Sequence, residues 1–228
     1  MTVTCFLPCR KGSERVPQKN IKVFADYQNG LVELKLKQLL SSTLIDEIIL
    51  STNDEEILEY AESLGSRKIR IHKRLEALSS SATSTDDLVS HALQLIPDSH
   101  ILWTHVTAPF INGYDYDIII SEYLRSLASG YDSLMTTTVI HSFLWNADGP
   151  INYDRNIEKW PRTQTLPAVH EVNSGVFLSH SRIYKMFGDR IGQKPIFHPL
   201  DKIRGFDIDW PDDFSLAECM VSAGLAKL

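Results

Sequence analysis

The chain has 228 residues and a formal net charge of −6. This length fits one α/β domain with an insertion, and the negative charge argues against a broad basic surface for nucleic acid. No apolar run reaches the roughly 18 residues of a membrane-spanning helix. At the N-terminus apolar residues precede the first charges, the reverse of a signal peptide, so we expect a cytoplasmic protein. Cys5, Cys9 and Cys219 lack zinc-ligand spacing and are expected to be reduced and buried.

The first predicted element is a short buried strand over residues 2–8, which runs directly into a basic loop. Gly12 allows this loop to adopt a positive φ and lets its backbone approach a ligand. Exposed backbone N–H groups beside fixed cations form an anion-binding loop, although the motifs GxxxxGK[ST] and GxGxxG are both absent. A solvated basic turn is the alternative interpretation. The polar residues of the loop are Arg10, Lys11, Ser13, Arg15, Lys19 and Asn20.

Strands and helices alternate through the first half of the chain. The pattern predicts a helix over 31–40, a strand over 48–52, a helix over 55–64 and a strand over 68–71. Asn53 or Asp54 is the expected N-cap of the second helix. This alternation predicts a parallel sheet with right-handed crossovers. Ligands of such sheets bind beyond the carboxyl ends of the strands, where the basic loop lies.

A long polar loop over residues 73–85 interrupts this alternation, and loops of this length are often functional. Ser84 or Thr85 then caps a predicted helix that ends near Leu95. A strand over 100–106, a helix over 115–127 and a strand over 132–140 complete the alternating part.

Residues 141–167 break the pattern and are rich in aromatic and turn residues. Asp148 and Gly149 predict a hairpin turn. An isolated hairpin cannot bury its own aromatic side chains, so this arm needs a partner surface. The alternative is an arm folded over its own domain.

Two aspartates near the C-terminus, Asp207 and Asp209, alternate along an extended segment and should face the same side. Neighbouring carboxylates repel unless a cation or a proton intervenes, and Mg²⁺ prefers such oxygen ligands. The alternative is helix capping by Asp209, with Asp212 and Asp213 in the first turn of a terminal helix over 214–225.

The opening motif PxRxGSxRxPxKN, from Pro8 to Asn20, resembles that of the sugar-acid cytidylyltransferases, and Gly12, Asn20 and the aspartate pair favour their acylneuraminate branch. The resemblance implies a doubly wound, mostly parallel, Rossmann-like nucleotidyltransferase fold. It divides the chain into a catalytic domain over 1–140 and 168–228 and an inserted β-hairpin dimerisation arm over 141–167. A homodimer is therefore expected.

The resemblance also assigns roles to residues. The residues expected to bind the nucleotide are Arg10, Gly12, Ser13, Arg15, Lys19, Asn20, Arg74 and Ser81. The residues expected to bind the sugar substrate are His105, Arg162, Gln164 and Asn173. Asp207 and Asp209 would hold Mg²⁺, and Arg10, Lys19 and Asp209 would be catalytic. The sequence departs from the family pattern at Cys9, Leu75, Ser81 and Ile111.

The predicted reaction is the Mg²⁺-dependent activation of a nonulosonic, sialic-acid-like sugar acid by CTP. Three alternatives stay open: a 3-deoxy-octulosonate-type cytidylyltransferase, a glycosyltransferase that uses its Asp-x-Asp pair on a nucleotide sugar, and a non-catalytic nucleotide-binding homologue. Neither a membrane nor a nucleic-acid partner is expected.

Overall fold

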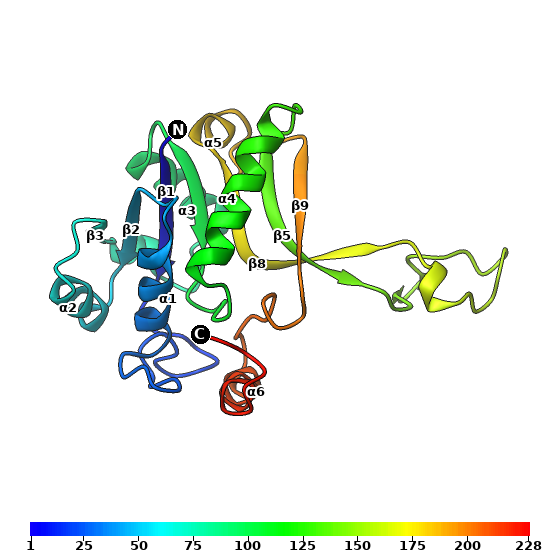
Figure 1. The fold of residues 1–228 in the computed structure, drawn as a ribbon, viewed down its shortest axis with the longest axis horizontal. Helices are drawn as coiled ribbons and strands as arrows, with labels where there is room; N and C mark the ends of the chain where they lie inside the picture. Colours follow the sequence, from blue (N-terminus) through cyan, green and yellow to red (C-terminus); the bar gives the residue numbers. More distant parts are fainter.

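A seven-stranded sheet forms the centre of the computed structural model, which describes residues 1–228 (Figure 1). Its strand order is β3-β2-β1-β4-β8-β5-β9. Strand β8 is antiparallel to both of its neighbours, and all other pairs are parallel. The predicted doubly wound, mostly parallel sheet is confirmed. The strands are β1 (Val3–Cys9), β2 (Glu47–Thr52), β3 (Ile69–Lys73), β4 (His100–Thr104), β5 (Ser133–Ile140), β8 (Val169–His180) and β9 (Pro195–Leu200).

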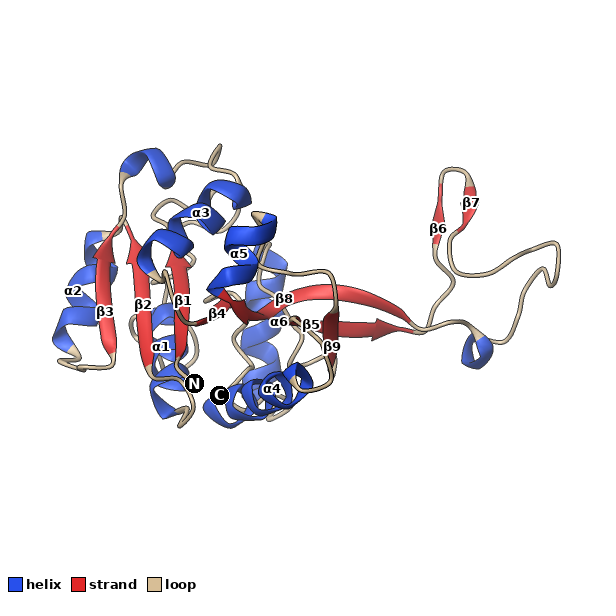
Figure 2. Ribbon diagram, turned by 90° about the horizontal axis from the view of Figure 1, so that it is seen from above, coloured by secondary structure: helices blue, strands red, loops and turns tan.

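Helices cover both faces of the sheet (Figure 2). The larger apolar core lies under α1, α2, α4 and α6, and includes Leu34, Ile57, Ile120 and Phe214. A smaller core lies under α3 and α5 and includes Trp103. The helices are α1 (Gly30–Ser41), α2 (Glu55–Ser63), α3 (Thr85–Leu95), α4 (Gly113–Leu127), α5 (Ser181–Phe187) and α6 (Pro211–Ser222). None of them combines the length and apolarity that crossing a membrane would require.

Helix caps explain where several elements begin. Asp54 accepts a hydrogen bond from the Glu56 amide, and Ser84 forms a reciprocal capping box with Asp87, as the sequence predicts. Helix α4 begins two residues before the predicted start because Asn112 forms a capping box with Asp115. One expectation about burial is wrong: Cys5 and Cys9 are buried, but Cys219 is exposed on α6.

The segment between Ile140 and Val169 leaves the body of the molecule as a long arm (Figures 1 and 2). It contains the predicted hairpin, formed by β6 (Trp145–Asn146) and β7 (Gly149–Pro150), and a short 3₁₀ helix over Thr163–Thr165. The arm projects away from its own domain, so the alternative of a folded-back arm is wrong. Trp145 and Trp160 stack on one another with 45% and 61% of their surface exposed. The homodimer stays a prediction.

Candidate active site

Two adjoining pockets lie at the carboxyl edge of the sheet, where β1, β4 and β5 end. The smaller pocket has a volume of about 280 Å³ and is lined by the basic loop that follows β1 and by residues 105–107 after β4. The larger has a volume of about 720 Å³ and lies between β5, β8 and the segment that leads into α6. Figure 1 shows the opening loop and α6 together at this edge.

The basic loop is held by hydrogen bonds to its backbone. The Asn20 side chain donates to the Arg10 carbonyl at 3.0 Å, and the Lys11 amide donates to the Asn53 side chain at 2.8 Å. Gly12 has the predicted positive φ, +79°, with open space where a side chain would start. Arg10, Ser13, Arg15, Lys19 and Asn20 all line the small pocket. The loop thus presents its cations toward a hollow large enough for a ligand.

Asp209 joins the two pockets, because it lines the larger one and contacts two cations that line the smaller one. The Arg15 guanidinium lies 3.2 Å from the Asp209 carboxylate and stacks over the Trp210 ring. The Lys19 ammonium lies 3.7 Å from the same carboxylate and donates to the Ile208 carbonyl at 2.7 Å. Burial lowers the pKa of Lys19, and the charge of Asp209 opposes that shift. The two ends of the chain therefore meet in one cleft.

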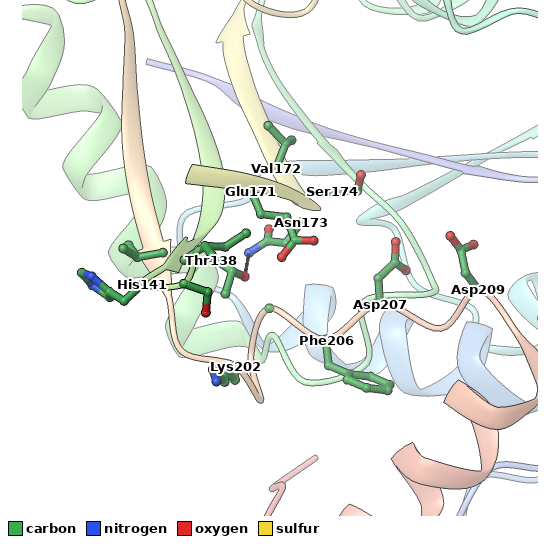
Figure 3. Close-up of a pocket in the computed structure, with 14 residues that line it drawn as sticks. Thr138, His141, Glu171, Val172, Asn173, Ser174, Lys202, Phe206, Asp207 and Asp209 are labelled. Carbon is green, nitrogen blue, oxygen red and sulfur yellow. Dashed lines mark hydrogen bonds between the residues drawn. The ribbon is translucent and has the colours of Figure 1, made fainter. Parts of the chain in front are cut away.

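Asp207 and Asp209 project in the same direction, toward the cleft (Figure 3). The residue between them, Ile208, is fully buried, and its amide donates to the Thr107 carbonyl at 2.9 Å. One carboxylate oxygen of Asp207, Oδ1, is buried without a hydrogen-bond partner. Burial raises the pKa of Asp207, and the charge of Asp209 adds to that shift. An orphaned carboxylate oxygen beside a second carboxylate is a suitable place for a cation.

Helix capping does not account for Asp209. The carboxylate of Asp213 accepts from the backbone amides of Asp209 and Trp210, at 2.9 and 2.7 Å. Asp213 therefore closes the first turn of α6, which begins at Pro211 rather than at the predicted Phe214. The carboxylate of Asp209 is free to face the cleft.

Asn173 lies in the wall of the larger pocket, at an irregularity in β8 where Ser174 has a positive φ of 56°. Its carbonyl oxygen accepts from Thr136 Oγ1 and from the Gly175 amide. Its amide donates to Thr138 Oγ1 (Figure 3). These bonds fix the orientation of the side chain and leave one N–H for another partner.

His105 lines the smaller pocket beyond the end of β4. The indole N–H of Trp103 donates to His105 Nε2 at 3.1 Å. Burial lowers the pKa of His105 to about 3, and the positive charge of Arg190 adds to the shift. Because its Nε2 lone pair is engaged and the ring stays neutral, His105 is poorly suited to act as a general base.

The sequence profile of the cytidylyltransferases matches residues 4–220. The chain belongs to the cytidylyltransferase family. Pseudaminic acid cytidylyltransferase from Campylobacter jejuni is 33% identical over 113 residues, 47% of this chain and 47% of that protein. N-acylneuraminate cytidylyltransferase from Escherichia coli is 23% identical over 94% of this chain and 51% of that protein. The alignments thus cover about half the length of these relatives.

Other relatives match over nearly their whole length. The 3-deoxy-manno-octulosonate cytidylyltransferase from Thermodesulfovibrio yellowstonii is 26% identical, covering 96% of this chain and 97% of that protein. A solved CMP-2-keto-3-deoxy-manno-octonic acid synthetase complexed with CTP has a TM-score of 0.68 at 12% identity, over 98% of this chain and 100% of that one. A 4-diphosphocytidyl-2C-methyl-D-erythritol synthase from Anaerococcus prevotii has a TM-score of 0.69 at 15% identity, over 97% and 98%. At these identities the solved structures support the fold alone.

Five of the residues assigned from the family resemblance do not line either pocket. Gly12 still belongs to the basic loop that lines the small pocket, whereas the other four come from other segments. Arg74 is buried below the polar loop that follows β3, where its Nε donates to Ser79 Oγ at 3.1 Å. Ser81 is exposed on that loop. Arg162 and Gln164 lie on the arm, at its 3₁₀ helix. A single chain does not bring these four residues to the aspartates.

Sequence reasoning missed several contributors to the site. Thr107 holds Ile208 through a backbone hydrogen bond, which no side-chain pattern reveals. Trp210 supports the Arg15 guanidinium at 4.8 Å. The Trp103–His105 contact could have been found, because the strand predicted over 100–106 places residues two apart on one face.

Proposed function

We propose that the protein transfers CMP from CTP to a nonulosonic, sialic-acid-like sugar acid and releases pyrophosphate. The observation that carries this proposal is the pair of contacts from Arg15 and Lys19 to Asp209, at 3.2 and 3.7 Å. They unite an anion-binding loop and a paired carboxylate in one cleft. Membership of the cytidylyltransferase family supports the choice of nucleotide, and the pseudaminic and N-acylneuraminate relatives support the sugar class.

In the proposed reaction the anomeric hydroxyl oxygen of the sugar acid attacks the α-phosphorus of CTP. A new phosphorus–oxygen bond forms, and the bond from the α-phosphorus to the bridging oxygen breaks. Pyrophosphate leaves with that electron pair, and the hydroxyl proton passes to solvent. No side chain in the cleft is a clear general base, so positioning and charge neutralisation would supply most of the acceleration.

The cations of the opening loop would hold the triphosphate and then the leaving pyrophosphate. Arg10, Arg15 and Lys19 line the small pocket together, and charge-assisted hydrogen bonds to phosphate are among the stronger polar contacts in proteins. Backbone groups around Gly12 and Ser13, with the Asn20 side chain, would complete the nucleotide contacts. The sugar acid would occupy the larger pocket beside Asn173.

We propose Mg²⁺ as the metal, held by Asp207 and Asp209. The buried, unpartnered Oδ1 of Asp207 fits a hard cation, which the triphosphate oxygens would also bind. When bound, Mg²⁺ supplies positive charge that stabilises the transition state and lowers the pKa of the attacking hydroxyl. Asp207 and Asp209 would hold the ion in place, and the Lys19 ammonium donates to the Ile208 carbonyl beside them.

We also propose a homodimer in which each arm packs against the second subunit. The half-exposed rings of Trp145 and Trp160 need such a surface, and an arm seated there could carry Arg162 and Gln164 toward the sugar pocket of the partner. Arg162 would suit the substrate carboxylate as a bidentate partner.

The test is pyrophosphate release from CTP and Mg²⁺ with a panel of sugar acids. The panel contains pseudaminic, N-acetylneuraminic and legionaminic acids together with 3-deoxy-manno-octulosonate, because an octulosonate relative matches over 96% of the chain. Pyrophosphate release with any of the first three acids supports the proposal. Release with octulosonate alone would mean that the substrate is an octulosonate rather than a nonulosonic acid. CTP binding without release from any acid indicates a non-catalytic homologue. Transfer from a nucleotide sugar without CTP turnover indicates a glycosyltransferase.

A further inference from the structure

A lysine in the middle of α1, Lys35, is completely buried. Its ammonium donates to the Ala108 carbonyl at 2.7 Å, to the Ile111 carbonyl at 3.3 Å and to the Tyr116 hydroxyl at 2.8 Å. No carboxylate lies within ion-pair distance of it in the structure. Burial lowers the pKa of Lys35 to about 7. Burying a polar or charged group away from water is costly, so this arrangement calls for a role beyond filling the core.

One branch of the Lys35 contacts leads to the aspartate pair. Lys35 fixes the 108–111 turn, which Gln38 also binds by donating to the Pro109 carbonyl at 2.7 Å. Thr107 immediately precedes this turn, and its carbonyl accepts from the Ile208 amide at 2.9 Å. The position of the residue between Asp207 and Asp209 is thus tied to Lys35 through one turn of chain.

The other branch leads to the wall of the larger pocket. The Tyr116 hydroxyl, bonded to Lys35, lies 2.9 Å from Thr104 Oγ1. Thr104 in turn donates to the Gly175 carbonyl at 2.7 Å, and the Gly175 amide donates to Asn173 at 3.2 Å. Packing there is tight: a Cβ on Gly175 would lie 2.6 Å from Ile111 Cδ1, in the turn that Lys35 binds.

We propose that Lys35 is a positioning residue that sets the segment of Asp207 and Asp209 against the β8 wall of the substrate pocket. It touches neither ligand and acts through the Thr107 turn and through the Tyr116–Thr104–Gly175 chain. This inference rests on the proposed function for its effect on turnover. Its effect on the two segments is independent of that function.

The test compares Lys35→Met with Lys68→Met in the 228-residue chain. Lys68 is a matched control because its ammonium donates to the Leu39, Leu40 and Ser42 carbonyls at the end of α1 and contacts neither pocket. Lys35→Met should lower kcat about 10²-fold, because misplacing the reacting groups by about 1 Å has an effect of that size. The KM for CTP should stay within about threefold of the wild-type value. Hydrogen exchange should quicken in peptides covering 173–175 and 207–209. Lys68→Met should change none of these.

Wild-type kcat and unchanged exchange in folded Lys35→Met would overturn the proposal, as would equal losses in both variants. Should Lys35→Met fail to fold, Tyr116→Phe removes only the hydroxyl link. It should then quicken exchange at 173–175 and leave 207–209 unchanged, and the opposite pattern would overturn the proposal. If wild-type protein releases no pyrophosphate, the proposed function fails, and the exchange experiment still decides the role of Lys35.

Discussion

Asp209→Asn should have opposite effects on nucleotide binding and on turnover. In the free protein the Asp209 carboxylate holds Arg15 and Lys19, the same cations that would bind the triphosphate. Removing its charge releases those cations and also removes a repulsion against phosphate. CTP should therefore bind more tightly in metal-free buffer. Turnover with Mg²⁺ should collapse, because one of the two proposed metal ligands is weakened.

The size of the effect on CTP binding follows from how far the Arg15–Asp209 ion pair is exposed to solvent. The Arg15 and Asp209 side chains are 47% and 48% exposed, so solvent screens the pair, and its contribution is at most about 1 kcal/mol. The affinity for CTP without metal should rise by up to about fivefold, since about 1.4 kcal/mol corresponds to tenfold. The free energy of unfolding should change by no more than about 1 kcal/mol. Turnover should fall at least about 10²-fold, the scale of losing electrostatic stabilisation of a transition state.

Calorimetric titration with CTP in EDTA and pyrophosphate release with Mg²⁺ measure the two effects. Asp212→Asn is the matched control, because it removes a charge from the same region, and Asp212 makes no ion pair in the structure. The control should leave both quantities within about twofold. Weaker CTP binding by Asp209→Asn in EDTA, or turnover within tenfold of wild type, would refute the reasoning.

Three further predictions concern stability and assembly. Asn112→Ala should lower the free energy of unfolding by about 1 kcal/mol in chemical denaturation, because the cap of α4 is lost, and should leave kcat within twofold. Burial lowers the pKa of His100 to about 4, below its unfolded value near 6.5. The unfolded chain therefore binds more protons between these values, and stability should fall as the pH drops below about 6.5. His100→Gln should flatten that dependence in urea titrations, and an unchanged slope would contradict the assignment. The double variant Trp145→Ala, Trp160→Ala should shift the mass measured by light scattering from dimer to monomer, unlike Ile157→Ala at another exposed arm position.

Much of the fold was predictable because local signals agreed with the tertiary structure. Alternating strands and helices predicted the parallel sheet, and Asp54 and Ser84 cap the helices where expected. Alternation along an extended segment placed Asp207 and Asp209 on one side, as Figure 3 shows. These features depend on residues that are close together in the sequence, so they can be predicted from the sequence alone.

The features that could not be predicted depend on contacts between residues far apart in the chain. Asp213, rather than Asp209, closes the first turn of α6, and the preceding segment is held by a backbone hydrogen bond from Ile208 to the distant Thr107. Lys35 interrupts a Leu-rich helix, and nothing local reveals that three acceptors surround it. The direction of the arm likewise follows from where β5 and β8 leave the sheet.

The most direct test of the shared CTP–Mg²⁺ cleft is a crystal structure of the protein with CTP and Mn²⁺, which locates the metal by anomalous scattering. The account predicts one metal peak bound by Asp207 and Asp209, with the triphosphate against Arg10, Arg15 and Lys19. A metal peak away from both aspartates, or a triphosphate bound outside the opening loop, would contradict it.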